Sequence, residues 1–176
     1  MKHLLILFWM LLGARTALSQ VSDKQLVPAG KIVWSDFIGS VDFASPYWAR
    51  TDWHVSYTYR TTSFRYDTLR LNVKVQVLLK PTSWVLPNRQ TDELLMHEQG
   101  HFNFALLLAS LFKKAVVSTV FTKADYAQKV KELFANILTE VKQLEVQYDA
   151  ETNHMKNKEA QLSWNKKLEE LLKAAE

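Results

Sequence analysis

Cysteine is absent from the 176 residues of this chain. The lack of thiols excludes disulfide bonds, and it also excludes the bacterial lipid-anchoring route, which modifies a cysteine directly after the signal sequence. The length is enough for one compact domain. That domain must be stabilised by its apolar core, with a bound metal ion as the other available cross-link.

A large excess of charge of one sign is also missing. The chain has 22 Lys and Arg against 18 Asp and Glu, and the leader described below contains Lys2 and Arg15. Most of the remaining positive excess lies between residues 20 and 90, scattered along alternating segments, as expected of a solvated sheet face. The composition therefore gives no case for a nucleic-acid partner. Internal repeats and low-complexity tracts are absent from the sequence.

The first residues have the pattern of a secretory signal peptide. Lys2 and His3 give a short positive start, residues 4–12 are apolar but too few to span a bilayer as a stable helix, and residues 17–19 are small or apolar. We predict a signal peptide at residues 1–19 and a single exported domain at residues 20–176. The protein is then periplasmic or extracellular in a bacterium, monomeric, and without a stable membrane anchor.

Alternating apolar residues in the first half predict a small antiparallel sheet. Residues 69–79 and residues 53–60 each alternate with a period of two, which is typical of half-buried strands that pair with each other. Residues 31–39 form a weaker strand candidate. Pro81 and Pro87 mark the end of the sheet region.

The second half predicts three helices. The first begins after Thr91, a good N-cap, and runs to about Val117. The second covers residues 122–148 with an amphipathic pattern, a break follows at residues 149–154, and the last helix covers about 156–174. We therefore expect an α+β domain in which the sheet packs on three helices.

Two histidines and a glutamate interrupt the apolar first helix with the pattern HExxH. Residues four apart lie above each other on a helix, so His97 and His101 can bind one ion through imidazole nitrogens. Glu98 is rotated by about 100° from His97 and is placed to act as a general base on a water molecule. Unpaired polar groups among apolar neighbours would be costly, which favours a bound Zn²⁺.

A catalytic zinc normally has three protein ligands, so a third must come from elsewhere. The extended HExxHxxGxxH pattern is excluded, because Phe104 and Leu107 stand where its glycine and histidine would be. His154, in the break before the last helix, is our leading candidate, whereas His54 lies among polar residues of a strand. The alternatives are carboxylates further along the chain: Glu140, Glu145 and Glu151.

Two further residues, Gly100 and Tyr148, each allow two interpretations. Gly100 inside the helix costs up to about 1 kcal/mol relative to alanine, which predicts either a close approach by another element or a tolerated accident. Tyr148 could stabilise an oxyanion beside the ligand segment, or it could be the last core residue of its helix.

Several short motifs together resemble a bacterial family of uncharacterised function, described as predicted secreted zinc-dependent proteases. The motifs are WSDFIG (34–39), SWV (83–85), LLMHEQGHF (94–102), YDAETNH (148–154) and QLSW (161–164). The resemblance covers about residues 32–172. It implies His97 and His101 as zinc ligands and Glu98 as the base, and it favours His154 as the third ligand.

These patterns predict a secreted zinc metallohydrolase. The leading prediction is a peptidase that acts on a peptide or protein substrate. A non-catalytic, zinc-stabilised domain of the cell envelope is the first alternative, since a metal can replace missing disulfides. A binding or assembly module that uses the apolar stripe of the second helix is the other.

Overall fold

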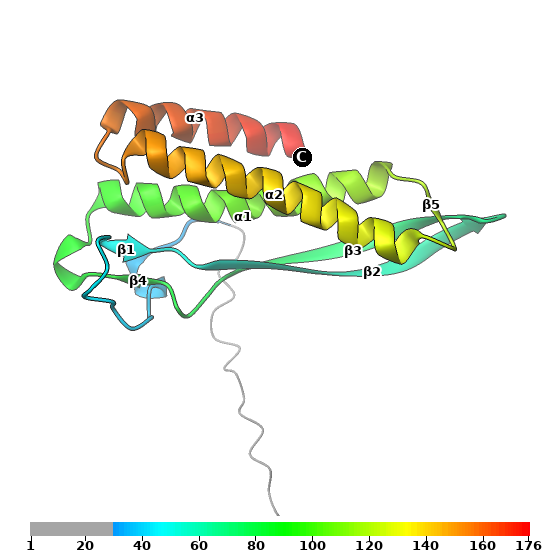
Figure 1. The fold of residues 1–176 in the computed structure, drawn as a ribbon, viewed down its shortest axis with the longest axis horizontal. Coiled ribbons are helices and arrows are strands. Elements are labelled where there is room, and N and C mark those ends of the chain that lie inside the picture. Colours follow the sequence, from blue (N-terminus) through cyan, green and yellow to red (C-terminus); the bar gives the residue numbers. More distant parts are fainter. Residues whose placement is uncertain (1–29) are drawn as a thin grey trace, which may run out of the picture.

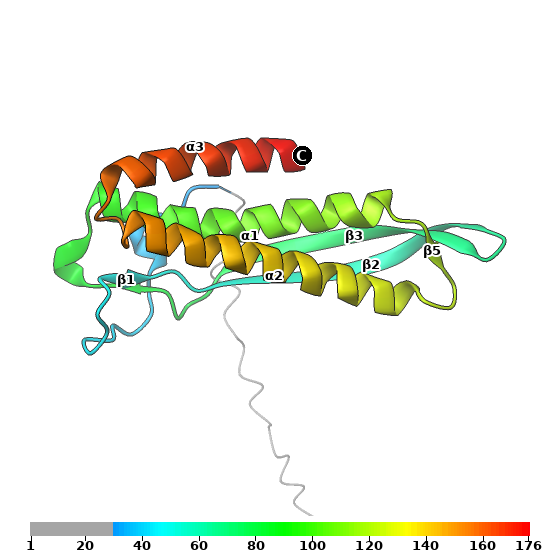
Figure 2. The same ribbon diagram turned by 45° about the horizontal axis from the view of Figure 1, so that its top comes forward.

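The computed structural model describes residues 30–176, so the predicted signal peptide lies outside the described residues. Within that range the α+β prediction is confirmed: small antiparallel sheets are built mainly from the first half, and three helices follow. The helices are α1 (Asp92–Ser118), α2 (Tyr126–Thr152) and α3 (Lys158–Ala175). Figures 1 and 2 show α1 between the sheet and α3, with α2 running beside α1.

The two strands with clear alternation form a long hairpin. Strands β2 (Trp53–Arg65) and β3 (Thr68–Leu79) pair antiparallel, with Val55 opposite Val77, as the alternation predicts. The short strand β5 (Phe121–Thr122) adds to the far end of β3. The apolar face packs on the helices, and the hairpin tip projects beyond them (Figure 1).

A second, two-stranded sheet lies at the other end of the molecule. Strand β1 (Ala49–Arg50) pairs antiparallel with β4 (Trp84–Val85), and a 3₁₀ turn, η2 (Pro87–Arg89), leads from β4 into α1. In Figure 1 the beginning of α1 lies next to β1, and the hydroxyl of Thr51, directly after β1, donates to the carboxylate of Glu98. The chain between β1 and β2 therefore passes close to the HExxH turn.

The strand predicted at residues 31–39 is wrong, because this segment contains a 3₁₀ turn, η1 (Trp34–Asp36). The carboxylate of Asp36 accepts a hydrogen bond from the amide of Val33 at 2.8 Å, and the side chain of Gln99 accepts one from the amide of Ile32 at 2.8 Å. Side-chain acceptors thus bond the backbone groups that a strand would have paired.

Helix α1 begins where predicted, but α2 has the predicted length and lies four residues further along the chain, at 126–152 instead of 122–148. The hydroxyl of Thr91 accepts from the amide of Leu94 at 3.2 Å, as an N-cap does. Helix α2 continues through the expected break and ends at Thr152, whose hydroxyl donates to the carbonyl of Tyr148 at 2.7 Å. Asp149 is consequently a helical residue, one turn beyond Glu145. Its place on α2 determines which side chains it contacts, as described below.

Helix α1 is the centre of the core. Among the described helices it is the one long and apolar enough to cross a membrane by length and composition, yet half of its most apolar stretch is buried. Phe104, Leu108 and Phe112 are fully buried against the hairpin and the other helices. A rigid central helix fixes the direction of the polar side chains at its start.

Candidate metal centre

The two histidines of HExxH meet on the inner face of α1. The Nε2 atoms of His97 and His101 are 3.3 Å apart, and the rings stand at 89° to each other. The side chain of His97 is 3% exposed and that of His101 is 14% exposed. The i, i+4 spacing thus directs both nitrogens to one point, as predicted.

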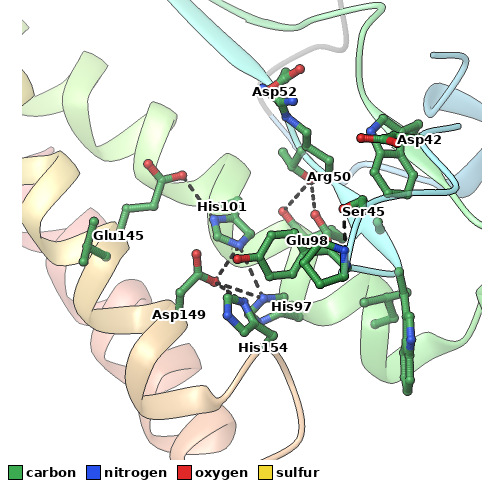
Figure 3. Close-up of a pocket in the computed structure, with 18 of the residues that line it drawn as sticks. Asp42, Ser45, Arg50, Asp52, His97, Glu98, His101, Glu145, Asp149 and His154 are labelled. Carbon is green, nitrogen blue, oxygen red and sulfur yellow. Dashed lines mark hydrogen bonds and ion pairs between the residues drawn. The ribbon is translucent and has the colours of Figure 1, made fainter. Parts of the chain in front are cut away.

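Asp149 of α2 completes a triangle with these nitrogens. Its Oδ1 lies 3.3 Å from Nε2 of His97 and 3.1 Å from Nε2 of His101. Ligand atoms at about 2.0–2.1 Å from a tetrahedral zinc are separated by about 3.3–3.4 Å, so the three edges match one face of such a site. Figure 3 shows the three side chains converging from two helices.

A network behind the triangle sets the tautomer of His97. Gln161 of α3 donates through Nε2 to the Tyr148 hydroxyl at 2.8 Å and to Asn165 at 2.9 Å, which leaves its Oε1 as an acceptor. That oxygen lies 3.0 Å from Nδ1 of His97. Nδ1 of His97 therefore carries the proton, and the lone pair of Nε2 points into the triangle.

Glu145 does the same for His101. Its Oε1 lies 3.1 Å from Nδ1 of His101 and accepts from the Trp53 indole at 2.9 Å, while its Oε2 accepts from Lys142 at 2.6 Å. When both imidazoles are neutral with Nδ1 as the donor, two imidazole lone pairs and a carboxylate oxygen face each other. Within residues 30–176 no hydrogen bond of good geometry reaches the buried Oδ1 of Asp149. Such a set of acceptors calls for a cation.

The carboxylates around the triangle strongly favour a positive charge at its centre. Burial by itself lowers the pKa of His101, but the nearby carboxylates of Asp149, Glu145 and Glu98 outweigh it and raise the pKa to about 10. Burial also opposes the charged form of Asp149, yet the two histidines hold the pKa of that carboxyl well below its ordinary value. The carboxylates that hold a proton on His101 would equally stabilise a divalent ion.

Glu98 lies beside the triangle and is not part of it. Its carboxylate is buried, with Oε2 accepting from the hydroxyl of Thr51 at 2.6 Å. Thr51 follows β1, so the second sheet positions this carboxylate. Glu98 therefore has one fixed oxygen, and its side chain lines the cavity described next.

A cavity of about 680 Å³ opens onto the triangle (Figure 3). One wall is the segment at residues 45–52, which includes β1, and the other is the last part of α2. Glu98, both triangle histidines and Asp149 line it. This volume is typical of small-molecule and peptide sites.

His154, the predicted third ligand, lies on the rim of the same cavity. Its Nδ1 is 3.5 Å from Oδ1 of Asp149, its ring packs on Tyr47 with centroids 4.7 Å apart, and 41% of the side chain is exposed. It does not belong to the group of ligand atoms lying within 4.8 Å of one another, which consists of His97, His101 and Asp149. Its predicted role as a ligand stays a prediction.

The three alternative carboxylates lie elsewhere. Glu140 is exposed on α2, and Glu151 is exposed and bonded to Gln147 and to the indole of Trp164. Glu145 holds His101 from behind. Asp149 was not predicted as a ligand, because residues 149–154 were expected to form a break between helices. Continuing the α2 helix would have placed Glu145 and Asp149 one turn apart on one face.

Gly100 and Tyr148 explain each other. A Cβ atom at residue 100 would collide with the phenol of Tyr148, so the close approach that Gly100 predicted is made by this ring. The ring stacks on His97 at 4.8 Å, and its hydroxyl donates to the carbonyl of His97 at 2.9 Å. Tyr148 is fully buried, and burial raises the pKa of its hydroxyl. The Tyr148 proton is thus committed to the backbone of α1.

A family model described as bacterial protein of unknown function (DUF922) matches residues 34–155, more than half of the chain. The chain belongs to this family. The DUF922 match spans both sheets, the HExxH turn, Asp149 and His154, and it ends before Gln161. The bacterial, uncharacterised family expected from the motifs is therefore found. No curated protein and no solved structure matches the chain.

Proposed function

We propose that this DUF922 protein is an exported zinc-dependent peptidase. The observation that carries the proposal is the triangle of His97, His101 and Asp149, which faces a cavity that Glu98 also lines. Two imidazole nitrogens and one carboxylate are the donor set of many catalytic zinc sites, which keep a further position open for water or substrate. Export is proposed from the signal-peptide pattern of residues 1–19.

Zinc, when bound, would supply a Lewis acid that polarises a carbonyl and lowers the pKa of water to about 7. The chain supplies the rest. Glu98 accepts a proton as the water oxygen adds to the peptide carbonyl carbon, and it delivers that proton to the leaving nitrogen as the C–N bond breaks. The hydroxyl of Thr51, 2.6 Å from Oε2, orients the carboxylate for both transfers.

The shape of the cavity favours a peptide as substrate. Its wall at residues 45–52 includes the short strand β1, and Tyr47, Trp48 and Trp84 line the cavity with aromatic rings. Extended chains pair with exposed strand edges, and aromatic rings take apolar side chains. The cavity volume leaves room for several residues of a substrate.

The alternative of a purely structural zinc fits the residues less well. Closed structural sites use four protein ligands. Within residues 30–176 the clustered ligand atoms number three, and a cavity reaches them. The structural alternative also assigns no role to the buried carboxylate of Glu98 and its bond from Thr51.

The experiment compares Glu98→Gln with wild type after export and purification of the full-length chain. We expect one zinc per protein in both, measured by elemental analysis. We expect hydrolysis of casein or of a peptide library by wild type and a fall of roughly 10²–10⁴-fold in the variant, the range for general acid–base groups. Glu140→Gln, an exposed change of the same kind, is the matched control and should keep full activity. Zinc-loaded wild type that cleaves no peptide would contradict the proposal.

A further inference from the structure

The turn between α2 and α3 is unusual in its backbone. Asn153, His154 and Met155 all have positive φ, at 47°, 49° and 72°. One left-handed residue ends many helices, and asparagine accepts that conformation readily. A second and a third, at histidine and methionine, cost free energy that the helix end does not require.

The strained turn has a clear geometric result. It sends Met155 into the apolar cluster under β1 and the start of α1, and it sends His154 to the cavity rim beside Asp149. Backbone hydrogen bonds fix the turn. The amide of His154 donates to the backbone carbonyl of Asp149 at 3.2 Å, and the amide of Asn157 donates to the backbone carbonyl of Thr152 at 2.9 Å. The imidazole of His154 is thus aimed next to the triangle from a rigid support (Figure 3).

Hydrolysis of an amide needs a donor for the carbonyl oxygen, which gains negative charge as water adds. Several donors near the triangle are already committed. Tyr148 donates to the carbonyl of His97, Trp53 donates to Glu145, and Thr51 donates to Glu98. Among residues 30–176, the polar side-chain contact of His154 is with Asp149 alone, at a loose 3.5 Å.

We propose that His154 is a catalytic residue that donates a ring N–H to the substrate carbonyl oxygen. This inference rests on the proposed peptidase function. It assigns His154 to the substrate rather than to the ion, because the ring lies outside the triangle, and the side chain lines the cavity and is 41% exposed. The turn at Asn153–Met155 then positions a donor, which accounts for its strain.

The test uses His154→Ala and His154→Gln in the exported full-length chain. We expect both variants to keep wild-type zinc content and, after exchange for Co²⁺, a wild-type visible spectrum. For peptide hydrolysis, kcat of His154→Ala should fall by about 10²–10³-fold with KM little changed, as for the loss of one oxyanion donor. His154→Gln, which retains an N–H donor, should recover part of kcat.

A second readout does not need hydrolysis. Inorganic phosphate presents a tetrahedral oxyanion, and its binding to the Co²⁺ protein can be followed in the visible spectrum. We expect His154→Ala to weaken this binding by about 10-fold or more. The peptidase proposal can therefore fail while phosphate still binds through His154. That result differs from a failure of this inference, in which His154→Ala leaves phosphate binding unchanged.

Three results would overturn the inference. Loss of the metal or a changed Co²⁺ spectrum in His154→Ala, without phosphate, would make His154 a ligand. Unchanged kcat and phosphate affinity would make it a bystander. Tyr47 also lines the rim, so a fall of kcat in Tyr47→Phe, with His154→Ala unaffected, would assign the donor to Tyr47. Thermal unfolding of each variant separates these results from a damaged fold.

Discussion

The phenol ring of Tyr148 occupies the space that any side chain larger than hydrogen at residue 100 would need. The same ring stacks on His97 and bonds its carbonyl, so one contact joins helix packing to the metal centre. The packing of Tyr148 from α2 therefore requires glycine at residue 100, although glycine is a poor helix former.

Gly100→Ala should destabilise the protein, although alanine is the better helix former. Alanine stabilises the helix by at most about 1 kcal/mol relative to glycine. Overpacking against the Tyr148 ring costs about 1–3 kcal/mol and would displace Tyr148 from His97. Urea unfolding of the metal-free protein measures this. In a Tyr148→Leu background the same change should cost much less, and an equal cost in both backgrounds would contradict the contact.

Asp149→Asn should abolish tight zinc binding while the fold persists. The amide is nearly isosteric but lacks the charge that faces two imidazole nitrogens at 3.1 and 3.3 Å. We expect zinc affinity to fall by more than the 10- to 100-fold that is usual for residues behind a ligand, roughly 100-fold or beyond. Competition with a chromogenic chelator measures it, and Glu140→Gln is the control. Wild-type affinity in Asp149→Asn would remove Asp149 from the site.

Glu145→Gln should act through His101. The amide keeps an acceptor for Trp53 and for Nδ1 of His101, but it loses the charge and the ion pair with Lys142. We expect zinc affinity to fall by about 10- to 100-fold, as for other residues behind a metal ligand. A fall as large as that of Asp149→Asn would instead make Glu145 a direct ligand, which was one of the alternatives for the third position.

Stability of the metal-free protein should depend on pH in a defined direction. The pKa of His101 is raised from 6.5 to about 10 in the folded protein, so its contribution is fully present below 6.5 and is lost as pH rises through about 10. The lowered pKa of Asp149 contributes above the ordinary carboxyl value and is lost as pH falls below it. Stability from these two groups should therefore be greatest at mildly acidic pH.

Urea midpoints across pH, with a chelator present, test this dependence. His101→Gln should flatten the decline between pH 6.5 and 10, and saturating zinc should do so as well because the ion replaces the proton. A metal-free protein that gains stability over the same interval would contradict the described surroundings of His101.

The local parts of this fold and site were readable from the sequence. The alternation of residues 53–60 and 69–79 predicts the hairpin because a period of two fixes both the faces and the pairing. His97 and His101 were found because their geometry depends only on spacing within one helix. The N-cap at Thr91 is equally local.

The parts that depend on contacts between elements were not readable. Asp149 joins the triangle through the packing of α2 on α1, and α2 was expected to end at Tyr148, one residue before Asp149. Gln161 reaches His97 from α3, 64 positions along the chain. The turn at residues 34–36 replaced an expected strand because Asp36 and Gln99 bond its backbone, a competition that alternation does not reveal.

The most direct test of the central claim is a crystal structure of the purified protein with diffraction data on both sides of the zinc absorption edge. The account predicts one anomalous peak that disappears below the edge, bonded to Nε2 of His97, Nε2 of His101 and Oδ1 of Asp149. Absence of that peak in protein grown with zinc, or a peak bonded without Asp149, would contradict it.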